Sequence, residues 1–168
     1  MPAGRVWRFP IYDLPFASLR DCLKAGRSPS AAVFSWPVRV YYEDTDLGGV
    51  VYYANYLKFM ERARTEWLRA LGFEQTALAR DHKVVFVVSS LTIDYLRPAA
   101  FNDELTVTVE LGKLGAGQII LRQEIARGVE ALAAASVRIG CVNTATFRPV
   151  RIPSSLSALL VRQAAKNR

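Results

Sequence analysis

The chain has 168 residues, 51% of them hydrophobic and 22% charged, so it is long enough to bury a core as one globular domain. No apolar run approaches the roughly 18 residues that a membrane helix requires, and Asp13 and three prolines interrupt the N-terminal segment. Neither a membrane span nor a cleavable signal sequence is therefore expected. Cys22 and Cys141 are too few for a disulfide framework and favour a reducing cytoplasm.

The net charge of +7 is carried by the ends of the chain. Residues 1–36 carry +3 and residues 148–168 carry +5, whereas the segment 37–147 carries −1. A nucleic-acid-binding domain would need a basic face on its core, so this distribution disfavours it. The basic C-terminal end can attract an acidic carrier protein or anionic lipid, and the alternative is a solvated tail. At most a peripheral association with the inner membrane is expected.

Taken in chain order, the first element is an extension at 1–35, whose segment 24–32 has the composition of a linker. Alternation predicts a strand at 36–44, with Val38, Val40 and Tyr42 on one face. Apolar residues at three- and four-residue steps predict a long helix at 55–73, and Gly72 is placed to end it.

The pattern then changes to strands. We expect strands at 84–96, 104–114, 118–127 and 131–146, with short glycine-containing turns at 115–117 and 128–129, and a C-terminal helix beginning near Pro153. The order predicts an α+β fold in which a curved antiparallel sheet wraps one long helix. The central domain is expected at 36–150, followed by a basic helix or tail at 151–168.

The stretch DTDLGGVVYYANY, residues 44–56, stands between the first strand and the helix and has no serine, cysteine or histidine. Its glycines let the backbone of 48–51 approach a ligand closely, so Gly49 is a candidate substrate-binding residue. The helix start offers unpaired N–H groups, and Asp46 is a carboxylate that can face them. A carboxylate opposite backbone donors can attack an acyl carbonyl, or activate water against it, without metal or cofactor.

The alternative for this stretch is structural, because an aspartate before a helix is commonly an N-cap and Gly-Gly is commonly a turn. Asp44 is interpreted in this way. Calcium is disfavoured because the stretch lacks the spaced oxygen ligands and closing glutamate of an EF-hand loop. The single histidine, His82, is expected in an exposed loop.

Residues 38–73 resemble the signature of hotdog-fold acyl-CoA thioesterases, and IDYLRPAAFNDELTV at 93–107 resembles the next segment of that family. The resemblance covers about residues 36–150 and is strongest to the YbgC-like, Tol–Pal-associated branch of the 4-hydroxybenzoyl-CoA thioesterase family. It implies a five-stranded antiparallel sheet around the helix, homodimers or homotetramers, and a site at the dimer interface. It also implies acyl-CoA, or an acyl group on acyl carrier protein, as the substrate.

The resemblance places the catalytic aspartate at Asp46 and the backbone amide that polarises the thioester carbonyl at Tyr53. It implies that Tyr42 and Glu61 line or brace the site, and that Val51 and Tyr52 lie beside the acyl group. The branch usually has Tyr-His-Ala where this chain has Tyr52, Tyr53 and Ala54. Because the contribution at that position is a main-chain N–H, the change affects the branch assignment more than the chemistry.

Ser89 and Ser90 interrupt an apolar strand, and are candidates to face the substrate of a partner subunit, although an outward-facing polar position fits them equally well. The leading hypothesis is a thioester hydrolase. The alternative is a hotdog protein that binds acyl thioesters or acyl carrier protein without turnover.

Overall fold

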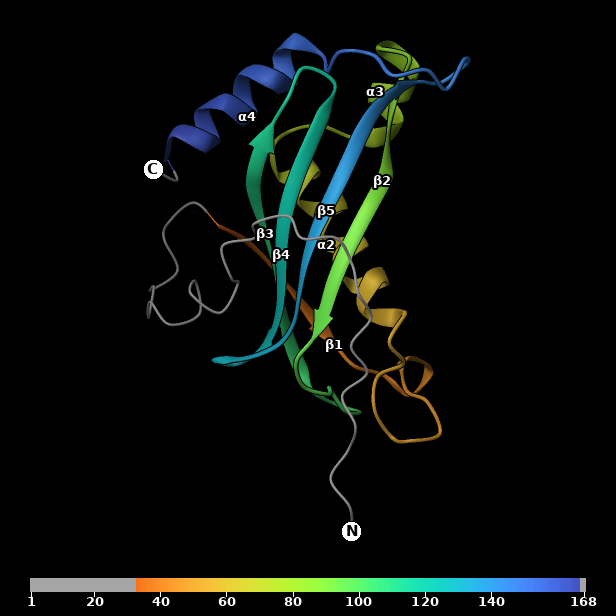
Figure 1. Ribbon diagram of the computed structural model, residues 1–168, viewed down its shortest axis with the longest axis vertical. Helices are drawn as coiled ribbons and strands as arrows, with labels where there is room; N and C mark the ends of the chain where they lie inside the picture. Colours follow the sequence, from red (N-terminus) through yellow and green to blue (C-terminus); the bar gives the residue numbers. More distant parts are fainter. Residues whose placement is uncertain (1–32, 167–168) are drawn as a thin grey trace, which may run out of the picture.

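The structure, a computed structural model, describes residues 33–166, so the predicted linker and Cys22 lie outside the described residues. Five strands form one antiparallel sheet in the order β1-β3-β4-β5-β2 (Figure 1). The strands are β1 (Phe34–Arg39), β2 (Val84–Tyr95), β3 (Glu104–Leu114), β4 (Gln118–Arg127) and β5 (Glu130–Asn143). The helical elements are η1 (Tyr42–Asp44), α2 (Asn55–Ala70), α3 (Gln75–Asp81) and α4 (Ser154–Lys166).

The sheet confirms the predicted architecture, and the two tight turns explain its order. Gly115–Gly117 joins β3 to β4, and Gly128, at φ +58°, opens the two-residue turn between β4 and β5. Glycine suits that turn because it adopts positive φ without steric cost. β1 and β2 are the two edges of the sheet, because each pairs with a single neighbour.

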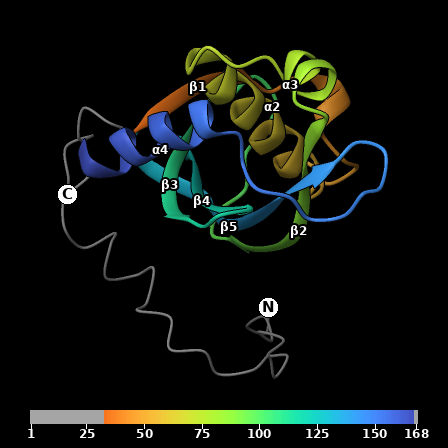
Figure 2. The same cartoon turned by 90° about the horizontal axis from the view of Figure 1, so that it is seen from above.

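The sheet curves around α2, and α4 packs against β3 on the same side of the sheet (Figure 2). Inner-face residues alternate along the central strands, and the helix meets them with the fully buried Phe59, Met60 and Ala63. Burying one large apolar side chain in this way contributes roughly 1.5–3 kcal/mol. The predicted amphipathic helix is thus the centre of the core.

One polar contact crosses this core. Gln123 of β4 is 3% exposed; its Nε2 donates to the Met60 carbonyl at 3.0 Å, and its Oε1 accepts from Arg64 Nη1 at 2.7 Å. Both ends of the buried amide are therefore satisfied, as a buried polar group requires.

The C-terminal end of α2 is closed by the predicted glycine. Gly72 has φ +86° and its N–H donates to the Arg69 carbonyl at 2.8 Å, while the Phe73 N–H donates to the Leu68 carbonyl at 3.1 Å. This pair of bonds is the Schellman motif, which satisfies carbonyls that the helix leaves unpaired.

Four features differ from the sequence analysis. The last strand was predicted at 131–146, but β5 ends at Asn143 and residues 144–146 form a turn. The first strand was predicted at 36–44 but runs from Phe34 to Arg39, and Tyr42 lies in η1 with 75% of its surface exposed, not on the buried face of Val38 and Val40. The Asp44 carboxylate accepts the Tyr41 N–H at 2.9 Å, which turns the chain out of the extended conformation. Hydrophobic alternation cannot reveal such a local side-chain bond.

The other two differences are helical. The helix α3 was not predicted, because its seven residues are too short for a clear period and bury only Leu78. The C-terminal segment contributes to the core, since Leu156 and Leu160 of α4 are fully buried. No helix in the described part of the chain is long and apolar enough to cross a membrane.

Candidate active site

A short hairpin of residues 44–52 leads from η1 to α2. Tyr52 N–H donates to the Asp44 carbonyl at 2.9 Å, Thr45 bridges to Val51, and Asp46 N–H donates to the Val50 carbonyl at 2.9 Å. Gly49 has φ +75° and open space where a Cβ would lie, and its N–H donates to the Asp46 carbonyl at 3.0 Å. The hairpin therefore carries Asp46 at its tip and Tyr53 at its base.

The two carboxylates of the hairpin differ in their surroundings. Asp44 is 7% exposed and holds the Tyr41 N–H, in agreement with the structural interpretation of that residue. Asp46 is exposed, and its Oδ1 accepts the Gly48 N–H at 2.8 Å. Within residues 33–166 its Oδ2 has no hydrogen-bond partner, so Asp46 offers an oriented carboxylate with one oxygen open to react.

The start of α2 leaves backbone donors open. The Tyr52 carbonyl accepts the Asn55 N–H at 2.8 Å, which directs the N–H of the same peptide unit, that of Tyr53, away from the helix. In the described structure, neither the Tyr53 nor the Ala54 N–H donates to a protein acceptor, and no side chain caps the helix. The first turn has no acidic residue, so the partial positive charge of the helix end is not neutralised there.

The segment 95–103 braces this hairpin from the other side. Val51, 4% exposed, donates its N–H to the Ala99 carbonyl at 2.8 Å, and Val50 bridges to Ala100. The Ala99 N–H donates to the hydroxyl of buried Tyr56 at 2.9 Å, which ties the brace to α2.

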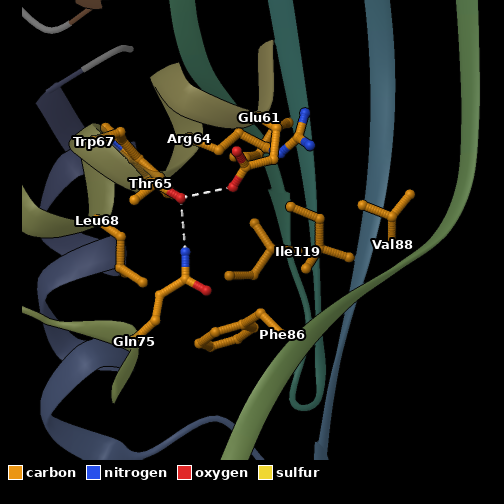
Figure 3. A pocket seen from close by; sticks show the side chains of 11 residues that line it. Glu61, Arg64, Thr65, Trp67, Leu68, Gln75, Phe86, Val88 and Ile119 are labelled. Carbon is orange, nitrogen blue, oxygen red and sulfur yellow. Dashed lines mark hydrogen bonds between the residues drawn. The ribbon is translucent and has the colours of Figure 1, made fainter. Parts of the chain in front are cut away.

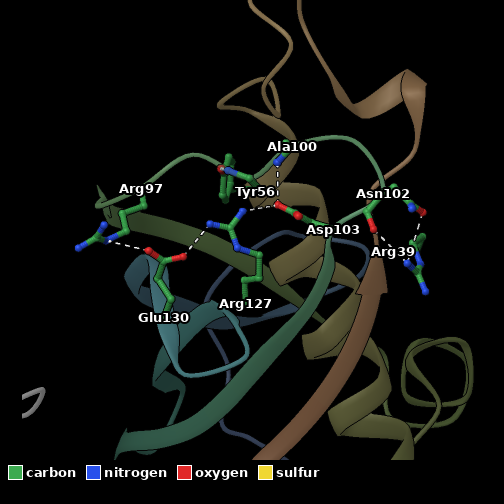
Figure 4. Close-up of polar contacts among 9 residues, drawn as sticks. Arg39, Tyr56, Arg97, Ala100, Asn102, Asp103, Arg127 and Glu130 are labelled. Atoms are coloured by element: carbon green, nitrogen blue, oxygen red, sulfur yellow. Dashed lines mark hydrogen bonds and ion pairs between the residues drawn. The ribbon is translucent and has the colours of Figure 1, made fainter.

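Ion pairs anchor the far end of the brace (Figure 4). The Asp103 Oδ2 accepts the Ala100 N–H at 2.8 Å and also bonds Arg127 Nη1 at 2.6 Å. Arg127 Nη2 also bonds Glu130 Oε2 at 2.6 Å, and Glu130 in turn pairs with Arg97 at 3.2 Å. The brace is therefore connected to the ends of β4 and β5.

Three tyrosines gather at the helix start. Tyr53 is 61% exposed and its carbonyl accepts the Tyr95 hydroxyl at 2.9 Å; Tyr52 is 42% exposed and its ring centre lies 4.5 Å from that of Tyr53. A hydrogen bond with the Tyr53 side chain raises the pKa of the Tyr52 phenol above its usual value. Tyr42 is separate from this group and stacks on Phe101 with ring centres 3.9 Å apart.

A cavity of the described structure lies farther along α2 and has a volume of about 120 Å³ (Figure 3). Its apolar walls come from β2, β4 and β5 and include Phe86, Ile119 and Ile139. Glu61 stands at its polar side, where Gln75 Nε2 donates to Thr65 Oγ1 at 2.8 Å and Thr65 donates to Glu61 Oε1 at 2.8 Å. Glu61 lies six positions after Asn55, the first residue of α2, which is about 9 Å along the helix axis.

Ser89 and Ser90 lie at a bulge in β2, where the pairing with β5 shifts between Val88 and Ser90. Both are exposed, and the Ser89 hydroxyl donates to the Arg138 carbonyl at 3.3 Å. Five residues of strand separate Ser90 from Tyr95, about 17 Å. The structure therefore does not bring these serines to Asp46 within one chain.

This arrangement can perform acyl transfer chemistry at the hairpin. An exposed carboxylate and an open backbone N–H at a positive helix end supply a base or nucleophile and an oxyanion donor. Sequence reasoning missed Asn55 and Tyr95. Asn55 is 5% exposed and its Nδ2 donates to the Asp44 carbonyl at 2.9 Å. The position of Asn55 directly before the apolar helix pattern could have indicated it. For Tyr95 the sequence offered no indication beyond its position in the segment IDYLRPAAFNDELTV.

Comparison with known proteins assigns the family. The model of the thioesterase-like superfamily matches residues 40–160. An acyl-CoA thioesterase YbgC from Haemophilus influenzae is 46% identical over 125 residues, covering 74% of this chain and 92% of that protein. An acyl-CoA thioester hydrolase YbgC from Escherichia coli O157:H7 is 42% identical over 130 residues, covering 77% and 96%.

A solved structure agrees. The crystal structure of a probable thioesterase from Bartonella henselae superposes with a TM-score of 0.70 at 37% identity, covering 72% of this chain and 99% of that one. The predicted hotdog fold is thereby confirmed. The chain belongs to the thioesterase-like superfamily and, within it, to the YbgC acyl-CoA thioesterases.

Proposed function

We propose that this protein hydrolyses acyl-CoA thioesters to a free acid and the CoA thiol, with Asp46 and the Tyr53 backbone N–H as its catalytic groups. The observation that carries the proposal is the exposed Asp46 carboxylate on a hairpin that runs into an uncapped helix start. The YbgC relatives support it, because their names describe the same reaction.

In this mechanism the thioester carbonyl oxygen accepts the Tyr53 N–H. The open Oδ2 of Asp46 takes a proton from water as the water oxygen bonds to the carbonyl carbon, or attacks that carbon itself before water releases the acid. The developing negative charge on oxygen is stabilised by the helix end. The C–S bond then breaks and the sulfur leaves as thiolate, which is protonated.

Apolar side chains lie between the helix start and the cavity, and the acyl group is placed along them. Val51 and Tyr52 stand beside that start, and the inner face of β2 carries Leu91 and Ile93 between Tyr95 and the cavity. We place the far end of a longer acyl group in this cavity, with Glu61 at its polar side. A cavity of about 150 Å³ accepts a benzene-sized group, so about 120 Å³ suits a short or branched tail.

The free edges of the sheet favour self-association. β2 is a 12-residue edge strand whose Val88 and Tyr95 are 50% and 45% exposed, and such an edge pairs readily with a second copy. We propose a dimer, or a tetramer of two dimers, in which Ser89 and Ser90 face the substrate of the partner subunit and Tyr42 lines or braces the site. Light scattering gives the mass, and a fully active monomer contradicts this assembly.

The experiment that tests the function is a thiol-release assay of the full chain on acyl-CoAs of varied length and aromaticity. We expect turnover with a preference set by acyl shape. The same acyl groups on acyl carrier protein test the second substrate class. Binding of acyl-CoA without thiol release would support instead a hotdog protein that holds thioesters without cleaving them.

A further inference from the structure

The turn that carries the proposed oxyanion donor has no cap, yet one side chain from a distant part of the chain holds it. Tyr95, the last residue of β2, donates its hydroxyl to the Tyr53 carbonyl at 2.9 Å. This is the one side-chain hydrogen bond made to the backbone of residues 52–54 in the described structure. The Tyr95 ring also packs edge to face on Tyr53, at 6.5 Å between centres, and on Tyr56, at 5.4 Å.

The bond between Tyr95 and the Tyr53 carbonyl also restricts the direction in which the Tyr53 N–H points. The Tyr53 residue lies between two peptide units, and each has its carbonyl held: that of Tyr52 by the Asn55 N–H at 2.8 Å and that of Tyr53 by Tyr95. With the planar peptide units on both sides fixed, the Tyr53 N–H has little freedom to rotate. The first contact is part of the helix start itself, so Tyr95 supplies the second constraint.

Tyr95 also links the donor to the carboxylate. Four residues after Tyr95, the Ala99 carbonyl accepts the Val51 N–H at 2.8 Å, and Val51 belongs to the hairpin that bears Asp46. The segment 95–99 thus holds the donor through a side chain and the Asp46 hairpin through its backbone. The buried Tyr56 hydroxyl accepts the Ala99 N–H, so the segment cannot shift independently of α2.

We propose that Tyr95 is a positioning residue, whose hydroxyl sets the Tyr53 N–H at the correct place relative to Asp46 for the developing oxyanion. This inference rests on the proposed thioesterase function. Burial first, and then the neighbouring Tyr53 and Tyr56, raise the pKa of the Tyr95 phenol, so the hydroxyl stays a donor at neutral pH.

The experiment is the substitution Tyr95→Phe in the full chain, which keeps the ring contacts and removes only the hydroxyl. We expect kcat on acyl-CoA to fall about tenfold with KM within about twofold, because an interaction used mainly in the transition state is weakened. The matched control is Tyr41→Phe, whose side chain is 60% exposed and outside the site; it should keep both constants.

Two measurements separate positioning from a general loss of structure. Thermal unfolding of Tyr95→Phe should stay near that of the parent protein, while hydrogen exchange of the Asn55 amide, which donates to the Tyr52 carbonyl in the same turn, should become faster. If the parent protein is active and Tyr95→Phe shows normal exchange of the Asn55 amide and a normal kcat, the positioning role of Tyr95 is wrong and the proposed function still stands. A parent protein that releases no thiol from any acyl-CoA overturns the proposed function, and the inference with it.

Discussion

The two ends of α2 are finished in opposite ways. At the C-terminal end, Gly72 and Phe73 close the helix and satisfy its carbonyls with two backbone bonds. At the N-terminal end, no side chain caps the helix, and the Tyr53 and Ala54 N–H groups have no acceptor in the described structure. A side-chain cap at an N-terminus typically contributes about 1 kcal/mol, and this helix does without it.

The two ends of α2 therefore serve different purposes, one for stability and one for function. The closed end needs only to stop the helix and return the chain to the core. The open end keeps donors available where a carbonyl oxygen can become negative, and Asp46 stands in the adjoining hairpin. Substitutions at the closed C-terminal end should therefore change the free energy of unfolding, and substitutions at the open N-terminal end should change turnover.

The largest effect is expected at the open end. Asp46→Asn keeps the size of the side chain and an acceptor for the Gly48 N–H but removes the charge that attacks or takes a proton. We expect kcat on acyl-CoA to fall by a factor on the order of 10² or more, with little change in thermal unfolding. The control is Asp81→Asn at the exposed end of α3, which should keep full activity. Equal activity of both variants would contradict the role of Asp46.

The closed end should respond in stability. Gly72→Ala places a side chain at φ +86°, where nothing blocks the methyl group but the backbone conformation is strained. We expect the free energy of unfolding to fall by about 1 kcal/mol and kcat to stay unchanged. Chemical denaturation and the thiol-release assay measure the two quantities. If Gly72→Ala has normal stability but reduced turnover, the closed end serves function, and the assignment of the two ends is wrong.

A smaller effect is expected from Tyr53→Phe, because the backbone N–H is retained and only a hydroxyl is lost. The edge-to-face contact with Tyr95 is also kept. We expect kcat to change by less than about twofold, since the N–H is the working group. If Tyr53→Phe is as damaging as Asp46→Asn, the phenol takes part in the reaction in place of the histidine usual in this branch.

The smallest effect is expected from deletion of residues 1–32. The sheet begins at Phe34, which pairs with Val109, so a cut before Val33 spares the first strand. We expect the shortened chain to unfold at a similar temperature and to hydrolyse acyl-CoA at a similar rate. A folded but inactive product would indicate that the extension reaches the site.

Most of the fold follows from hydrophobic periodicity. The limits of β3 and β4 agree with the prediction, because both strands alternate clearly and end at glycine turns or charged residues. The error at Tyr42 has another origin. A single bond between the Asp44 carboxylate and the Tyr41 N–H redirects the chain, and alternation carries no information about such a bond.

Only the local part of the candidate site could be proposed from the sequence. Asp46, Gly49 and Tyr53 are neighbours in sequence, so a motif could place them together. Tyr95 could not be assigned, because its contact with Tyr53 spans 42 positions and depends on the register of β2 against β5. Contacts of this kind appear only when the strands are in place.

The buried Gln123 amide has a consequence for any redesign of substrate range. Sliding α2 by one residue moves it about 1.5 Å and turns it by about 100°, which would take the Met60 carbonyl and Arg64 away from that amide. An unpaired buried amide costs about 1–3 kcal/mol, so this contact opposes any change in the position or rotation of α2 relative to β4. Where the cavity holds the acyl group, as proposed, substitution of wall residues such as Phe86 or Ile139 by smaller ones should admit longer or wider acyl groups more readily than a shift of the helix.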